Sequence, residues 1–306
     1  MSSAQRPTVV AEPVARELQG ALLPGVDHHQ QPVIISLDIS HGRKGSAFKD
    51  IRSVILDSWS LAQNSLSHPT DHLYPLFWSC TYVFSESERR VKSAASRSNF
   101  GASGHRVPGQ DRLALLRHIF IHDTKGHVNA SCGCQTIKPF DSLAQAQRIP
   151  TTRSRPLVVV GHDLRQDLAS LRHADFEIEQ FAPVVAYLDT QSTAVEQLGL
   201  RNAHRVSLRF LCQQLGLSYS NMHKSGNDAM YTLLALLELA ARSKNPGEEE
   251  VKDKLRELVA YAMEIKPRTI KKMREEAAAK RTETRAHNMA EDLLSGYELM
   301  IEEQEA

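Results

Sequence analysis

The stretch that decides the fold is "TTRSRPLVVVGHDLRQDLASLRH" at residues 151–173. Its apolar run at 157–160 follows a proline and predicts a short, buried strand. Gly161 then marks a tight turn, after which leucines recur at helical spacing, at positions 164, 168 and 171. The stretch therefore predicts a strand, a turn and a helix that packs on the sheet through its leucines.

The pattern continues downstream with one more strand and three helices. "PVVAYLDTQ" at 183–191 predicts the strand, and Asp189 or Thr190 is placed to cap the helix that begins near 192. An amphipathic helix is expected at 207–217. The helix expected at 225–241 is apolar nearly all round at its centre, which indicates burial on all sides.

Upstream, three runs of β-branched and aliphatic residues predict strands at 33–39, 50–59 and 77–84, the first two as neighbours in a hairpin. The polar, basic stretch at 85–109 is interpreted as a long loop, and 111–121 has helical spacing. Neighbouring strands followed by alternating strands and helices predict a mixed α/β sheet.

The length of 306 residues suits one substantial domain with extensions. We expect a mobile N-terminal arm at 1–31, a domain at 32–243 and a charged helical tail at 244–306. The net charge of +1 gives no overall attraction to nucleic acid. Basic residues gather at 266–285, but this pattern is more typical of a solvated helix face than of a phosphate-binding surface.

No apolar signal region opens the sequence, and no segment approaches the roughly 18 uninterrupted apolar residues that span a bilayer. The four cysteines form no spaced disulfide framework. We therefore expect an intracellular protein, cytoplasmic or nuclear and not secreted, with no membrane partner.

Cys132 and Cys134, with His122 and His127 upstream, offer side chains of the kinds that bind zinc. No second close pair supplies the usual ligand spacing. A polar loop with a buried thiol is the favoured interpretation.

Acidic residues stand where predicted strands end and helices begin: Asp38, Asp167 and Asp228, with His223 just ahead of the last. A nuclease that transfers phosphoryl groups needs carboxylates converging on two divalent ions about 3.5 to 4 Å apart, and a base to deprotonate water. Singly, each residue has a simpler explanation, such as a helix cap for Asp228 or a surface position for Asp167. Their order and contexts together favour a metal-dependent site.

The motifs "SLDIS", "VVGHDLRQDLASL" and "HKSGNDAMYTL" resemble those of the DEDDh family of 3′-to-5′ exonucleases. The resemblance implies a ribonuclease-H-like fold, with a mixed five-stranded sheet flanked by helices. It also implies Asp38, Asp167 and Asp228 as ligands of two Mg²⁺ or Mn²⁺ ions and His223 as the general base. More narrowly, "FGAS", "RPLVVVGHDLRQDL", "LDTQ" and "SGNDAMYTLLALL" look like the C-terminal domain of the fungal great-for-full-DEAD-box-activity family.

One position departs from the family pattern. The first motif has a glutamate two residues after the aspartate, and this chain has Ser40 there. Residues two apart on a strand face the same side, so Ser40 occupies the position of the second carboxylate. A neutral hydroxyl weakens a divalent-ion site, and we expect hydrolysis to be weakened. No spacing argument makes the nearby Asp50 a substitute.

The loop at 85–109 is the candidate surface for single-stranded nucleic acid, RNA or DNA. Its basic side chains and one aromatic ring could follow a phosphate backbone and stack on a base, although a solvated loop is the commoner case. These residues are Arg89, Arg90, Lys92, Arg97, Phe100 and Arg106.

Three functions remain open from the sequence. The protein is a metal-dependent exonuclease, or a degenerate one that binds nucleic acid without hydrolysis, or an inactive scaffold whose charged tail recruits protein partners. Binding of single strands without release of nucleotides separates the second from the first. Absence of any oligonucleotide binding at low salt indicates the third.

Overall fold

A computed structural model describes residues 31–40, 49–58, 77–84, 100, 103–121, 154–200, 205–223, 226–243 and 249–264. All of them belong to one compact unit, which extends to Glu264. No helix among these residues is long and apolar enough to cross a membrane.

Six strands form one mixed sheet within the described part of the chain, in the order β4-β3-β2-β1-β5-β6. β2 runs antiparallel to both β1 and β3, and the other neighbours are parallel. The bounds are β1 Val33–Ser40, β2 Asp50–Asp57, β3 Phe77–Val83, β4 Ser103–Arg106, β5 Leu157–Gly161 and β6 Val184–Asp189.

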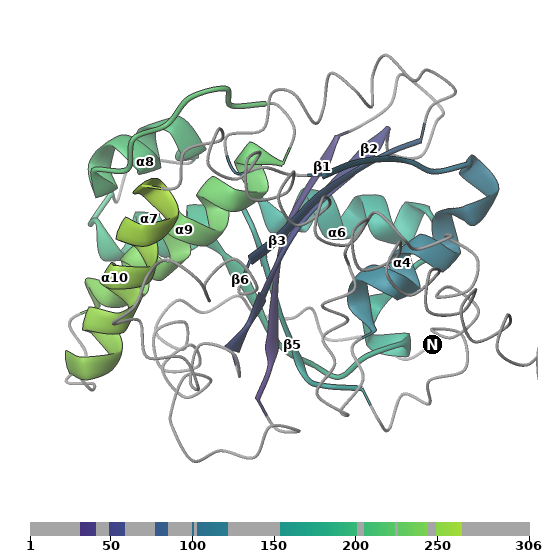
Figure 1. The fold of residues 1–306 in the computed structure, drawn as a ribbon. Helices are drawn as coiled ribbons and strands as arrows, with labels where there is room; N and C mark the ends of the chain where they lie inside the picture. The colour runs from purple at the N-terminus through teal and green to yellow at the C-terminus, as the bar shows by residue number, and fades with distance from the viewer. Residues whose placement is uncertain are drawn as a thin grey trace, which may run out of the picture. The chain divides into compact units, whose positions relative to one another are not determined.

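Helices cover both faces of the sheet (Figure 1). On one face lie α7 (Thr190–Gln197), α8 (Leu208–Leu215), α9 (Asn227–Ala241) and α10 (Glu249–Glu264), and on the other α4 (Arg112–Phe120) and α6 (Leu164–His173). Short 3-10 turns lie at Gly109–Asp111 and Ile178–Gln180.

The alternation of side chains along β1 explains the two layers. Ile34 packs in the core under α9, whereas Val33 and Ile35 pack in the core under α4 and α6. α9 lies directly on β1, where the Ser36 hydroxyl donates to the Ala229 carbonyl oxygen at 2.7 Å. α9 is apolar nearly all round because it is enclosed by the sheet and by α7, α8 and α10.

These elements confirm the α/β class with a mixed sheet flanked by helices. The sheet has six strands instead of the five expected, because β4 lies in the stretch that we interpreted as a loop. The sequence of β4, "SGHR", is polar and short, as befits an edge strand, and shows no alternation of apolar residues.

The predicted division into arm, domain and tail stays a prediction. Of the segment assigned to the tail, residues 249–264 form α10, whose Leu255 and Leu258 pack in the same core as α9. Residues 1–30 and 265–306 lie outside the described residues, as do the cysteines and histidines considered for zinc.

Candidate carboxylate site

β1 extends beyond its parallel neighbour, and this leaves Asp38 at an open end of the sheet. The ladder between β1 and β5 ends where Ser36 pairs with Val160. β5 then turns into α6 at Gly161, where a Cβ would lie 2.8 Å from the Leu164 Cδ1. Glycine thus permits the sharp turn, and Asp38 follows Ile34 and Ser36 on the α9 face of β1.

Asp167 supports the free end of β1 through its backbone. Its carboxylate accepts a hydrogen bond from the Ile39 amide at 3.1 Å, which takes the place of the strand partner that β5 no longer provides. Burial raises the pKa of Asp167 well above its ordinary value, and repulsion from Asp38 raises it further. The Asp167 carboxylate therefore lies at the Ile39 amide, next to Asp38 in the chain, and its role as a metal ligand stays a prediction.

Asp228 lies in the first turn of α9, next to His223. Gly226, at φ 76°, caps the helix, and the Asp228 carboxylate accepts the His223 amide hydrogen at 2.8 and 2.9 Å. Burial and then Asp38 raise the pKa of Asp228, whereas the His223 amide, the His223 ring and Arg52 lower it. The third motif therefore folds onto the same end of the sheet as Asp38.

The His223 imidazole is held near this carboxylate but faces solvent. Its Nδ1 lies 3.4 Å from the Asp228 Oδ2, and its side chain is 91% exposed. The His223 backbone adopts a left-handed conformation, with φ 61°. This position is compatible with a base that meets water, and the role assigned to His223 stays a prediction.

Arg52 lies among the carboxylates. On β2 it pairs directly with Asp38 on β1, so both side chains stand on the same face. Its Nη1 donates to the Asp38 Oδ2 and lies 4.0 Å from the Asp228 Oδ2. Its Nη2 lies 3.0 Å from the Asp50 Oδ1. One guanidinium thus contacts Asp38 and Asp50 and approaches Asp228.

Asp50 pairs with Ser40 across the same two strands. It therefore places a carboxylate beside the position where the family has its second acid. Asp50 is buried, and that carboxylate is directed to Arg52. The spacing of residues in the sequence does not relate Asp50 to Ser40. The register between β1 and β2 does, because it makes the two residues direct partners.

This set of side chains does not fit a two-metal site. Among the described residues, no group of three or more histidine, cysteine or acidic side chains is arranged to hold a metal ion. Ser40 offers a hydroxyl where a carboxylate is needed, and a guanidinium lies between the other acids.

A further acidic residue, Asp189, holds together the starts of α6 and α7 beside the site. Its carboxylate caps α7 by accepting from the Gln191 amide at 2.8 Å. It also accepts from the amides of Asp163 and Leu164, both at 3.1 Å, at the start of α6. The predicted cap is confirmed at Asp189, and it joins two helix starts instead of one.

His162 completes this support next to Gly161. Its Nε2 donates to the Val206 carbonyl oxygen at 2.8 Å, and its Nδ1 lies 2.9 Å from the Thr190 Oγ1. Burial lowers the pKa of His162. The partly buried ring is therefore neutral at physiological pH and joins β5 to the chain ahead of α8.

Of the residues proposed to contact nucleic acid, the structure describes Phe100 and Arg106. The Phe100 ring packs edge-on against Tyr231 of α9, with centroids 5.1 Å apart. It therefore packs against the hydrophobic core around α9. The other four lie outside the described residues: Arg89, Arg90, Lys92 and Arg97.

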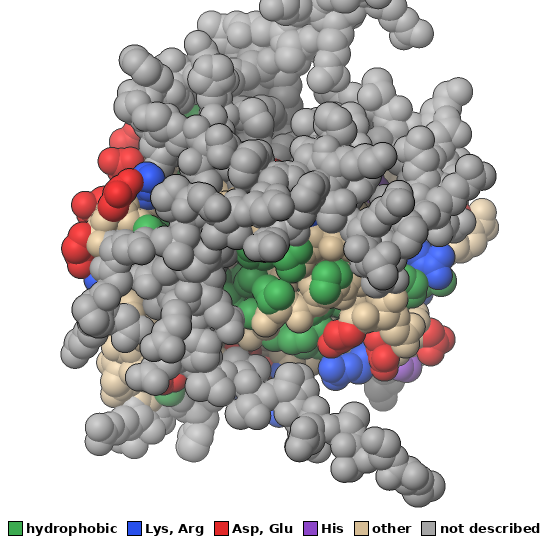
Figure 2. Space-filling model, turned by 90° about the horizontal axis from the view of Figure 1, so that it is seen from below, with side chains coloured by type: hydrophobic (Ala, Val, Ile, Leu, Met, Phe, Trp, Pro, Cys, Tyr) green, Lys and Arg blue, Asp and Glu red, His purple; other side chains and the backbone are tan. Residues whose placement is uncertain are grey.

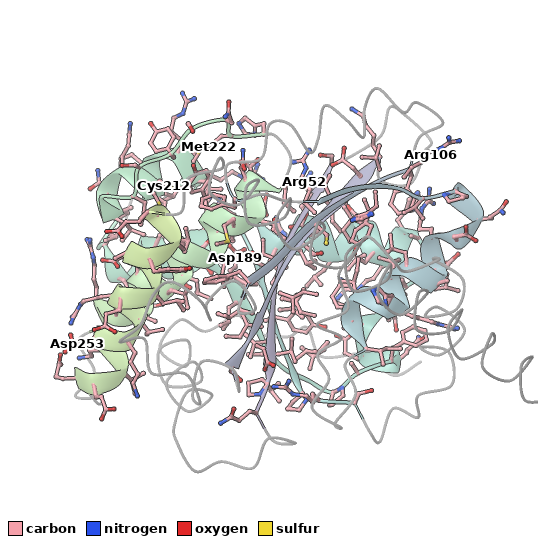
Figure 3. The ribbon with its side chains drawn as sticks, viewed as in Figure 1. Arg52, Arg106, Asp189, Cys212, Met222 and Asp253 are labelled. Atoms are coloured by element: carbon pink, nitrogen blue, oxygen red, sulfur yellow. The ribbon has the colours of Figure 1, made fainter. Side chains whose placement is uncertain are left out.

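Arg106 is brought to the carboxylate end of the sheet. Ser40, Asp50, Val83 and Arg106 form one row of paired residues across β1, β2, β3 and β4. Three strand spacings place Arg106 roughly 14 Å from Ser40. Figure 3 shows Arg52 and Arg106 toward the same end of the sheet.

Lys49, which the sequence analysis did not single out, adds an exposed cation to this end. Its amide donates to the Ser40 carbonyl oxygen at 2.7 Å. Figure 2 views the molecule from below, and on that side hydrophobic side chains gather near the centre.

Comparison with protein families matches residues 130–239 to the family described as DNA polymerase III subunit epsilon-like, C-terminal domain. The match covers about a third of the chain. It includes Asp167, His223 and Asp228, and it does not reach Asp38 or Arg52. A comparison with curated proteins finds no match.

Proposed function

Because this chain carries a DEDDh exonuclease-like domain, we propose that it binds single-stranded nucleic acid along the carboxylate end of its sheet and hydrolyses it weakly or not at all. The observation that carries the proposal is the position of two exposed cations at the end of the sheet that carries the motif residues: Lys49, bonded to the Ser40 backbone, and Arg106, in the row that starts at Ser40. The narrower resemblance to the fungal family stays a prediction.

Binding is proposed to begin at Lys49 and Arg106. Both are exposed at the end of the sheet where the three motifs meet. Asp38, Asp50 and Asp228 carry more negative charge than Arg52 neutralises, so phosphates are repelled from the centre of the site and attracted to its cationic border. The backbone of a single strand can follow such a border without sequence recognition.

Weak hydrolysis follows from the ligand set. A second carboxylate is needed to hold a divalent ion and position the attacking water. Ser40 cannot supply it, and Asp50 is engaged with Arg52. The resemblance to the family implies Mg²⁺ or Mn²⁺. The binding of single-stranded nucleic acid that we propose requires neither ion.

The test is a fluorescence anisotropy titration of the full chain with labelled single-stranded RNA and DNA over a range of salt concentrations. Lys49→Gln and Arg106→Gln should each weaken binding and reduce the slope of log affinity against log salt by about one. Arg256→Gln, on α10, is the matched control for loss of an exposed arginine that pairs with an acid.

Two results contradict the proposal. If the full chain binds neither oligonucleotide at low salt, the result favours the alternative function, an inactive scaffold that recruits protein partners. If it binds with unchanged affinity in the Lys49→Gln and Arg106→Gln variants, the surface is elsewhere.

A further inference from the structure

We infer that the Arg52 guanidinium occupies the place of the divalent cation in this carboxylate site, so that the domain holds its motif residues together without a metal. The inference concerns the same acids as the proposed function. It does not depend on whether the domain binds nucleic acid.

The placement of Arg52 follows from the backbone. Asp38 and Arg52 are direct partners in the β1–β2 register, and such partners have Cβ atoms about 5 Å apart on one face of the sheet. The guanidinium therefore reaches Asp38 without leaving the face that carries the site. Its side chain is 11% exposed, so the neighbouring structure restricts it to this location.

The contacts of Arg52 are those that a bridging cation would make. Nη1 donates to the Asp38 Oδ2 and lies 4.0 Å from the Asp228 Oδ2. These carboxylates come from β1 and from the first turn of α9, which are far apart in the sequence. One positive group thus joins the first and third motifs, as a metal ion does in the family.

A divalent ion cannot bind these acids while Arg52 stays in place. Magnesium needs oxygen ligands at about 2.1 Å in near-octahedral geometry. An ion that bridges Asp38 and Asp228 would lie in contact with the Nη1, and both groups are positive. The guanidinium cannot lose its proton to relieve the repulsion.

The surrounding residues agree with a resident guanidinium. Asp50 gives Arg52 a second ion pair from the position opposite Ser40. A second carboxylate at position 40 is needed to hold a divalent ion, and a monovalent guanidinium with two acids in contact needs none. Ser40, Asp50 and Arg52 are therefore one consistent set of side chains for a site that holds a guanidinium.

The test is a titration of the full chain with Mn²⁺ alone, followed by the paramagnetic signal of the free ion. Wild type and the control Arg256→Gln should leave this signal as it is in buffer. Arg52→Gln should bind Mn²⁺ at least about tenfold tighter than wild type, because a positive charge next to the ion is removed. Adding Asp228→Asn to Arg52→Gln should abolish that binding.

Thermal unfolding of wild type in Mn²⁺ and in chelator gives a second measurement that needs no variant, and the two midpoints should coincide. Mn²⁺ binding by wild type that Asp228→Asn removes would overturn the inference. A folded Arg52→Gln variant that binds no Mn²⁺ would also overturn it. Oligonucleotide binding is read separately, so its absence would refute the proposed function and leave this inference standing.

Discussion

Arg52 and Asp38 face each other across the β1–β2 pair, and an ion pair between Nη1 and Oδ2 joins them. The relationship links two strands of the sheet to α9, because the same guanidinium approaches Asp228. It explains how acids from distant segments remain together.

A double-mutant cycle should measure this pair. Arg52→Gln should lower the free energy of unfolding by about 2 to 4 kcal/mol, because it leaves mostly buried carboxylates without a counter-charge. Asp38→Asn in the Arg52→Gln background should cost less than in wild type, with a coupling of about 1 to 2 kcal/mol. Urea denaturation checks both values, and a coupling near zero would contradict the ion pair.

Asp189 should contribute more to the free energy of unfolding than an ordinary helix cap does. Asp189→Ala removes the acceptor for three backbone amides at the starts of α6 and α7, and should lower the free energy of unfolding by about 2 to 3 kcal/mol. Glu196→Ala, at an exposed position of α7, is the control and should have little effect. Equal effects of the two substitutions would show that the double cap contributes nothing.

His162 should make stability depend on pH. Its folded-state pKa is lowered from 6.5, so its contribution is fully present above pH 6.5 and is lost as the pH falls through the lower, folded-state pKa. His162→Gln should therefore be less stable than wild type above pH 6.5, and the difference should shrink below it. His173→Gln controls for loss of an exposed imidazole. A difference that does not change with pH would refute this role of the His162 ring.

Restoring the missing acid should not restore hydrolysis by itself. In Ser40→Glu the new carboxylate meets a site that already holds a guanidinium, and it should form another ion pair there. Release of terminal nucleotides in Mn²⁺ should be greater for Ser40→Glu combined with Arg52→Gln than for either change alone. Activity in Ser40→Glu alone would show that Arg52 moves aside for the metal.

The sequence predicted the elements whose signals are local. The strand, Gly161 and helix of 157–173 form as expected, and the third motif does fold at the start of an apolar helix. The capping role of Asp189 toward α7 was predictable for the same reason, because its partner there, the Gln191 amide, lies in the next turn.

What depends on strand register could not be predicted in this way. Alternation shows that Asp50 and Arg52 share one face of a strand, but it does not show which residues of β1 they meet. The pairing of Asp38 with Arg52 is fixed only when the two strands join. β4 was missed because a four-residue polar edge strand carries no hydrophobic pattern. The motif also specifies neither the left-handed backbone of His223 nor the exposure of its side chain.

We propose that this domain binds a single strand and hydrolyses it weakly or not at all. The most direct measurement incubates the full chain with an end-labelled single-stranded oligonucleotide and Mn²⁺, and analyses the bound fraction for length. The bound oligonucleotide should remain mostly of full length and should be released by high salt. Complete shortening of the oligonucleotide by wild type, absent with Asp228→Asn, would contradict the proposal.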